Sequence, residues 1–386
     1  MPNLHDYLYW RGDLSFDQVP LNELDGLTLT RFAYMPFEAV PFGTGENVGS
    51  LCHKLEKLPA DFFRLNEDAR FVQLLEDAER FNICPVTDFV KKNDDVKVMQ
   101  FAAVTVHLPG DLLYIAFCGT DSTLLGWKED FYMSFMEDVP AQCAALEYAI
   151  RIADQYPDKS FILGGHSKGG NLAIYTAVNL PEEYKARIVR VSDYDGPGFP
   201  KDYIDSHDFG SVLDRLHSYL PQESMIGRIH EHAKDFSVVE STESGLNQHN
   251  VYTWNLKRDD FQKLDRPAEA SEVAYHTIQN ILKETSPEQR HLYVDGVFDL
   301  LTVRNVVEVS DLGNNLSGVA SNVLKTLSTL TNEDREGIQD VNGAMVKAYL
   351  TAVKDVRIEK LPDVNDLLGH LPLRTTLQEI TDIFKA

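Results

Sequence analysis

The chain has 386 residues, 43% of them hydrophobic, and its 60 acidic residues outnumber its 36 basic ones to give a formal net charge of −24. This length and apolar fraction provide a core for one large domain or two ordinary ones and exclude a disordered chain. The acidic balance argues against a nucleic-acid partner and against stable anchoring to an anionic membrane, because both need clustered Lys and Arg.

The cysteines give no sign of a metal site or a disulfide framework. Cys52, Cys84, Cys118 and Cys143 are scattered, without a C-x-x-C pair, as expected in a reducing compartment. The first ten residues show no basic stretch followed by an apolar one, and no apolar run is long enough to span a bilayer. We therefore predict a cytoplasmic protein, while its oligomeric state stays open.

The first third of the chain is predicted to be mainly helical. Helical periodicity covers residues 20–34 and 60–81, whereas residues 1–19 and 36–60 are predicted to be irregular. The period then changes, and apolar residues at 96–106 and 112–117 predict two strands joined by a Pro-Gly-Asp turn. Together they predict a hairpin that enters a buried sheet.

From residue 140 onward, predicted strands and helices alternate. Helices are expected at 140–156 and 171–180, a short one at 225–229, and strands at 161–163, 188–191, within 212–220 and at 236–240. This alternation predicts a mostly parallel α/β sheet. Only helices are predicted beyond residue 265, at 268–284, 287–301, 316–330, 335–355 and from 375. We therefore divide the chain into an α/β domain at 1–265 and a helical C-terminal region at 266–386.

The most informative stretch runs from Gly164 to Gly170. A short apolar strand precedes it and a predicted helix follows, with Gly165-x-Ser167-x-Gly169 at the turn between them. This is the pattern of the nucleophile elbow in α/β-hydrolases, where a strained turn projects a serine hydroxyl above the sheet. The glycines leave room for the bent backbone, and the helix N-terminus offers N–H groups to an oxyanion. Ser167 is thus the candidate nucleophile.

A serine nucleophile requires a base and an acid, which follow it in the chain order Ser, acid, His. His249 lies after the last predicted strand of the sheet and is the candidate base, ahead of His217, His230 and His232. Two carboxylates are candidates for the acid: Glu223 follows the penultimate strand, and Asp195 follows the strand before it. Position favours Glu223, with Asp195 as the alternative.

An oxyanion hole needs two donors. One candidate is the backbone N–H of Lys168, the residue after the nucleophile. The other is Thr120, at the end of the strand predicted over 112–117, through its N–H and its hydroxyl.

These residues carry a resemblance to known families. Phe117-Cys118-Gly119-Thr120, followed by Trp127 and Asp130, and the segment Gly165 to Gly170 resemble the F-R-G-T/S, W-x-x-D and G-H-S-x-G-G motifs of lipase class 3, the fungal-type triacylglycerol lipases. The resemblance covers roughly residues 20–255, and Cys118 departs from it by replacing the Arg that supports the oxyanion loop.

The whole chain is more similar to an uncharacterised bacterial family of predicted α/β-hydrolases, which shares the segments Tyr194 to Phe199, Pro221 to Ser224 and Gln248 to Trp254. The resemblance implies Ser167 as nucleophile and His249 as base. Lipase class 3 places an Asp just after the penultimate strand, where this chain has Glu223.

The sequence therefore predicts an α/β-hydrolase fold and a serine hydrolase that acts on small-molecule or lipid carboxylic esters through an acyl-enzyme, without metal or organic cofactor. A thioesterase or amidase with the same triad is the first alternative. A binding or scaffold protein that keeps the fold without turnover is the second, since a fold does not fix a function.

Overall fold

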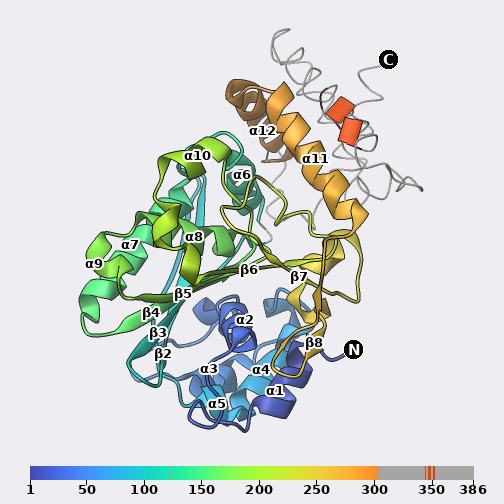
Figure 1. The fold of residues 1–386 in the computed structure, drawn as a ribbon. Coiled ribbons are helices and arrows are strands. Elements are labelled where there is room, and N and C mark those ends of the chain that lie inside the picture. The colour runs from blue at the N-terminus through green and yellow to red at the C-terminus, as the bar shows by residue number, and fades with distance from the viewer. Residues whose placement is uncertain (122, 303–343, 345–346, 349–350, 353–386) are drawn as a thin grey trace. The chain divides into compact units, whose positions relative to one another are not determined.

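The structure, a computed structural model, describes residues 1–121 and 123–302, together with residues 344, 347, 348, 351 and 352. The chain divides into two compact units, residues 1–120 with 140–267, and residues 121–139 with 268–386. The first unit holds a central sheet (Figure 1). Among the described residues, no helix is both long enough and apolar enough to cross a membrane.

The central sheet has eight strands in the order β1-β2-β3-β4-β5-β6-β7-β10. Neighbours from β3 to β7 are parallel, whereas β1, β2 and β10 join antiparallel at the edges. The carboxyl ends of β3 to β7 thus share one edge, where α/β sheets carry their sites. The strands span Val86–Asp94 (β1), Met99–Leu108 (β2), Leu112–Phe117 (β3), Ser160–His166 (β4), Ile188–Tyr194 (β5), Leu216–Pro221 (β6), Ser237–Val239 (β7) and Lys263–Leu264 (β10). A separate pair joins β8 (Leu256–Lys257) to β9 (Asp260–Phe261).

Helices cover both faces of this sheet (Figure 1). Successive side chains of a strand point to opposite faces, so Tyr114 and Ala116 of β3 join one core cluster, whereas Leu113 and Ile115 join the other. Burial on both faces explains why β3 reads as a continuous apolar run. One face is packed by α1 (Leu4–Arg11), α2 (Glu23–Phe32), α3 (Val48–Leu55), α4 (Asp68–Asp77) and α5 (Glu79–Asn82); the other is packed by α7 (Pro140–Gln155), α8 (Lys168–Asn179) and the segment holding α10 (Lys201–Ser206).

Two buried ion pairs tie the α1–α5 layer together. Arg80 Nη2 lies 2.6 Å from Asp25 Oδ2, and Arg31 Nη2 lies 2.5 Å from Asp68 Oδ2, with all four side chains at most 3% exposed. Loss of one partner of a buried pair leaves an uncompensated charge and typically costs about 3–5 kcal/mol. These pairs therefore fix how α2 packs against the first turn of α4 and against α5.

The predicted mostly parallel sheet is confirmed, as is the β2–β3 hairpin. The prediction was wrong where elements are short or polar. Helix α1 and helix α3 fall in segments predicted to be irregular, and the polar edge strand β1, with Lys91-Lys92-Asn93-Asp94, was missed. The helix expected at 60–81 is broken by a non-helical stretch at 63–67, and turns replace the one expected at 225–229.

The second unit contains α6 (Leu124–Tyr132), α11 (Glu269–Glu284) and α12 (Pro287–Thr302). Helix α6 packs on α12, where the Tyr132 hydroxyl donates to Asp295 Oδ1 at 2.6 Å and Lys128 Nζ lies 3.0 Å from the same oxygen. The helices predicted at 316–330 and from 375, and most of the one at 335–355, lie outside the described residues.

Candidate active site

Ser167 occupies a strained turn between β4 and α8. Its φ of 59° lies in the left-handed region, which a residue with a Cβ seldom adopts, and its backbone N–H donates to the Tyr194 carbonyl at 3.0 Å. The half-buried serine is the N-cap residue of α8, so its neighbours at the start of the helix present their N–H groups next to it. Strand, turn and helix therefore form the predicted elbow.

The glycines of the elbow are required by close packing. A Cβ on Gly165 would lie 2.0 Å from the Gly169 carbonyl oxygen, and one on Gly169 would lie 2.2 Å from the Phe117 carbonyl oxygen. Both distances fall far below van der Waals contact with backbone atoms. The G-x-S-x-G spacing thus lets α8 pass directly over β3 and β4.

His249 comes to the elbow from the segment after β7. It ends the short 3-10 helix η5 (Gly245–His249), and its ring lies 4.3 Å from the His166 ring, centroid to centroid. Nδ1 of His249 and Oδ2 of Asp195 are 2.6 Å apart. Because a carboxylate only accepts, Nδ1 carries the proton and Nε2 is left as the basic nitrogen.

Both carboxylate oxygens of Asp195 are held by hydrogen bonds. It follows β5 at a φ of 53° and is 1% exposed. Its Oδ1 accepts hydrogen bonds from the Ser224 hydroxyl and, at 3.2 Å, from the Gly227 N–H, so that Oδ2 is left for His249. The structure therefore pairs His249 with Asp195, the alternative acid of the sequence analysis.

Glu223, the carboxylate that position favoured, does not pair with His249. Its Oε2 accepts a hydrogen bond from the Gly245 N–H at 2.7 Å, and its backbone N–H donates to Gln248 Oε1 at 3.0 Å. Glu223 therefore fastens both ends of η5. The carboxylate after β6 therefore supports the segment that carries His249, whereas the carboxylate after β5 pairs with the His249 ring.

His166 is a neutral neighbour of His249. Its Nε2 lies 2.9 Å from the His249 carbonyl oxygen, which can only accept, and its Nδ1 lies 3.1 Å from the Tyr34 hydroxyl. Burial above all, and then the charge of His249 and of nearby arginines, holds the pKa of His166 well below its usual range. His166 thus anchors the backbone of His249 without competing for a proton.

A pocket of about 470 Å³ opens beside the two histidines. It is lined by Arg31, Tyr34, Arg64, Leu65, Glu67, His166, Glu243, Leu246, Asn247, His249, Asn250, Val251 and Thr253. Among the described residues the structure records no hydrogen bond between the Ser167 hydroxyl and the His249 ring. In unliganded sites such bonds are often long and shorten when substrate binds.

The two oxyanion candidates lie on either side of the elbow. Lys168 is the first residue of α8, and its buried side chain points away to Gln100, with Nζ 3.0 Å from both the carbonyl and the amide oxygen. Thr120, 4% exposed, follows Gly119, where a Cβ would lie 3.0 Å from Ser167 Cβ. The loop after β3 therefore lies against Ser167.

A second buried carboxyl lies behind the Asp195 turn. Asp193 Oδ1 accepts from the Gly196 N–H at 2.9 Å, whereas Oδ2 has no hydrogen-bond partner among the described residues. Burial, reinforced by the charge of Asp195, raises the pKa of Asp193 to about 8. Asp193 therefore keeps its proton to a higher pH than an exposed aspartate does. No sequence motif marks this carboxyl, because Asp193 lies inside an apolar strand.

We expect Asp193→Asn to stabilise the protein at alkaline pH but not at pH 4. The unfolded chain releases this proton near pH 3.8 and the folded chain near pH 8, so wild-type stability falls through this window by up to about 1.4 kcal/mol per pH unit. Asn does not titrate and still offers an oxygen to Gly196. Urea unfolding of both proteins from pH 4 to 9 measures the difference, and a difference that does not grow with pH would contradict the assignment.

The competing histidines lie elsewhere. His232 Nε2 lies 2.5 Å from the Gly227 carbonyl oxygen. His217 belongs to β6, and its Nδ1 lies 3.7 Å from Glu23 Oε1. His230 is buried at a φ of 65° in a turn, not on the expected helix. None of the three pairs with Asp195, whereas His249 does.

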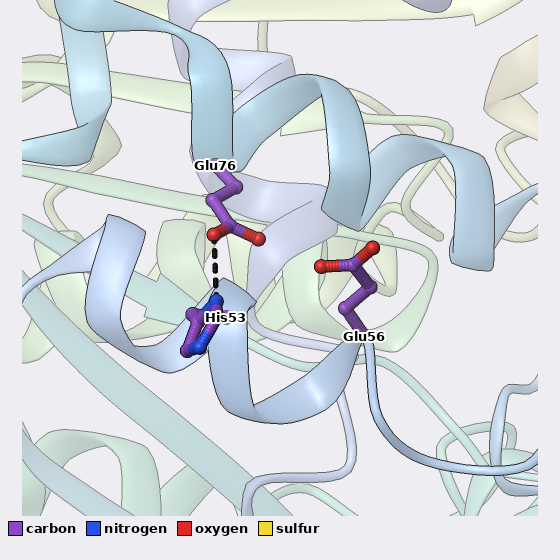
Figure 2. A group of neighbouring side chains, drawn as sticks. All are labelled: His53, Glu56 and Glu76. Atoms are coloured by element: carbon purple, nitrogen blue, oxygen red, sulfur yellow. Dashed lines mark hydrogen bonds and ion pairs between the residues drawn. The ribbon is translucent and has the colours of Figure 1, made fainter.

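Among the described residues, one group of possible metal ligands lies at the C-terminal end of α3 and on α4. It consists of His53, Glu56 and Glu76, whose ligand atoms lie within 4.8 Å of one another (Figure 2). His53 Nδ1 lies 2.9 Å from Glu76 Oε1, and Lys57 Nζ lies 3.0 Å from His53 Nε2. Protein groups thus satisfy both ring nitrogens, and the cluster is exposed to solvent. It carries no metal assignment.

The mostly parallel sheet, the helices on both faces and the serine elbow after β4 define an α/β-hydrolase fold, as predicted. The sequence of residues 75–299, more than half of the chain, matches the family described as Mbeg1-like. The chain belongs to this Mbeg1-like family. The similarity to an uncharacterised bacterial family stays a prediction.

No curated protein sequence matches the chain. Among solved structures it is similar to a Rhizomucor miehei lipase in complex with its propeptide, at 14% identity over 54% of this chain and 68% of that chain, with a TM-score of 0.33. M37 lipase is 14% identical over 54% and 70% of the two chains, with a TM-score of 0.37. Lip2 lipase from Yarrowia lipolytica is 10% identical over 44% and 69%, with a TM-score of 0.32. At these scores the likenesses carry no functional argument.

Proposed function

We propose that this protein is a serine hydrolase of carboxylic esters, with Ser167 as nucleophile, His249 as base and Asp195 as the orienting acid. The 2.6 Å pairing of His249 Nδ1 with Asp195 Oδ2 beside the strained elbow carries the proposal. Ser167, His249 and Asp195 come from three segments near the carboxyl edge of one sheet, and the ring of His166, next to Ser167 in the chain, lies 4.3 Å from the His249 ring, centroid to centroid. This is the arrangement that nucleophilic acyl transfer requires.

In the proposed reaction, the Ser167 hydroxyl attacks the ester carbonyl while Nε2 of His249 takes its proton. Asp195 stabilises the resulting imidazolium without taking the proton itself. The N–H groups of Lys168 and Thr120 stabilise the negative charge on the carbonyl oxygen. The imidazolium then protonates the leaving alcohol. In the second half of the reaction, water attacks the acyl-enzyme with His249 as the base, and Ser167 leaves and regains its proton from His249. The pocket beside His249 has a volume suited to a small ester.

A fluorophosphonate probe tests this function directly. The probe phosphonylates a serine only where a base and an oxyanion hole activate it, so the enzyme is expected to carry the label on Ser167, located by peptide mass spectrometry. An unlabelled protein would instead support a binding or scaffold role. Rates on matched ester, thioester and amide substrates then separate an esterase from a thioesterase or amidase.

Asp195→Asn is expected to reduce turnover by roughly 10⁴-fold, and Glu223→Gln by less than about tenfold. In the asparagine variant the amide oxygen remains for Ser224 and Gly227, so the amide NH₂ faces His249 and forces the wrong imidazole tautomer. The glutamine variant keeps an oxygen for the Gly245 N–H. Esterase rates paired with melting temperatures check the comparison. A fully active Asp195→Asn with an inactive Glu223→Gln would return the acid to Glu223.

A further inference from the structure

Two side chains from the helical layer hold the loop that follows β3. The Tyr34 hydroxyl accepts a hydrogen bond from the Gly119 N–H at 2.9 Å, and Arg64 Nη1 donates to the Thr120 carbonyl oxygen. Tyr34 lies two residues beyond the end of α2, and Arg64 lies in the non-helical stretch before α4. The loop is thus fixed from outside the sheet at two consecutive residues.

The two contacts flank one particular peptide group. The Gly119 N–H belongs to the peptide that joins residues 118 and 119, and the Thr120 carbonyl to the one that joins residues 120 and 121. The peptide between them carries the Thr120 N–H. Because peptide groups are planar, fixing the groups on both sides leaves this N–H little freedom to rotate.

Tyr34 is itself held in place. Two guanidinium groups lie over its ring, that of Arg31 at 4.8 Å from the ring centroid and that of Arg64 at 5.3 Å. Arg31 in turn is bound to the fully buried Asp68. The Tyr34 hydroxyl hydrogen points toward His166, whose carbonyl oxygen is 3.0 Å away, so the hydroxyl oxygen stays available to accept from Gly119.

The same loop presses on the elbow, since a Cβ on Gly119 would lie 2.5 Å from the His166 carbonyl oxygen and 3.0 Å from Ser167 Cβ. We propose that Arg64 and Tyr34 are positioning residues that fix the Thr120 N–H as an oxyanion donor to the Ser167 site, an inference that rests on the proposed function. Arg64 thereby supplies a guanidinium to the loop in which Cys118 stands where the lipase class 3 motif has Arg.

The test compares Arg64→Met with Arg64→Lys, Tyr34→Phe and the control Arg70→Met, which removes an exposed arginine of α4 outside the pocket lining. An oxyanion donor that is less firmly positioned stabilises the transition state less, while it changes substrate binding little. Arg64→Met and Tyr34→Phe are therefore expected to lower kcat about tenfold, short of the roughly 10²–10³-fold cost of deleting a donor, while KM changes less than about threefold. Arg64→Lys, which still donates to the carbonyl, is expected to recover most of the rate.

Phenylboronic acid supplies a second readout, because its tetrahedral adduct with a serine places an oxygen in the oxyanion hole. Its inhibition constant is expected to rise by about the same factor as kcat falls. If Arg64→Met kept the wild-type kcat and inhibition constant, or changed KM alone, the inference would be overturned. The proposed esterase function would not be affected by that result. A wild-type protein that neither hydrolyses p-nitrophenyl acetate nor is labelled at Ser167 would overturn both.

Discussion

Ser167→Ala is expected to abolish the hydrolysis of a short p-nitrophenyl ester, with a loss of about 10⁶-fold in turnover. The residue provides the only atom of the proposed triad that forms a covalent bond to substrate. Alanine keeps a Cβ at the strained φ of 59° and removes only the hydroxyl, so the fold is expected to stay intact. Ester hydrolysis and the melting temperature, measured on the same preparation, check both statements.

Ser160→Ala is the matched control, because Ser160 begins the strand that ends at the elbow. This variant also removes a serine hydroxyl, but at the opposite end of β4, and it is expected to leave turnover unchanged. Retention of more than about a tenth of the wild-type rate by Ser167→Ala would place the nucleophile elsewhere.

His249→Ala is expected to be nearly as damaging, again about 10⁶-fold, because the serine hydroxyl then has no base. The variant also leaves Asp195 Oδ2 without its histidine partner, so a lower melting temperature is expected alongside the lost rate. Steady-state rates and thermal unfolding measure the two effects separately.

His232→Ala is the comparison for this variant, since His232 is also bonded near the Asp195 turn, through the Gly227 carbonyl. It is expected to reduce stability through the lost buried contact and to reduce turnover only mildly. Equal and small losses of turnover in both variants would remove His249 from the proposed mechanism.

The elbow turn could be predicted from a local glycine pattern, and the place of His249 near the elbow could be predicted from chain order. Gly165 and Gly169 stand where a Cβ would collide with backbone, so their spacing around Ser167 records a physical constraint. His249 follows the last parallel strand, and chain order alone brings it to the carboxyl edge of the sheet.

Which carboxylate pairs with His249 could not be predicted, because the pairing depends on packing between segments distant in sequence. Asp195 and Glu223 both follow parallel strands, and both have oxygens engaged by the loops around them. What separates them is that Ser224 and Gly227 occupy Oδ1 of Asp195 and direct Oδ2 to His249. No residue pattern encodes that geometry.

The residues that support the loop after β3 likewise could not be predicted from the sequence. Arg64 lies in a stretch whose apolar period predicts a helix, yet residues 63–67 are not helical, and an exposed arginine there has no distinguishing pattern. Only the fold brings it to Thr120.

The α1–α5 layer also bears on where the functional domain begins. The family match starts at residue 75, whereas Tyr34, Arg64 and both acidic partners of the buried ion pairs precede it. A fragment cut at that boundary would separate Arg80 from Asp25 and uncover the sheet face that Leu24 and Phe32 pack against. The matched region is therefore shorter than the folding unit, and fragments for expression, or alignments meant to compare active sites, need to begin before α1.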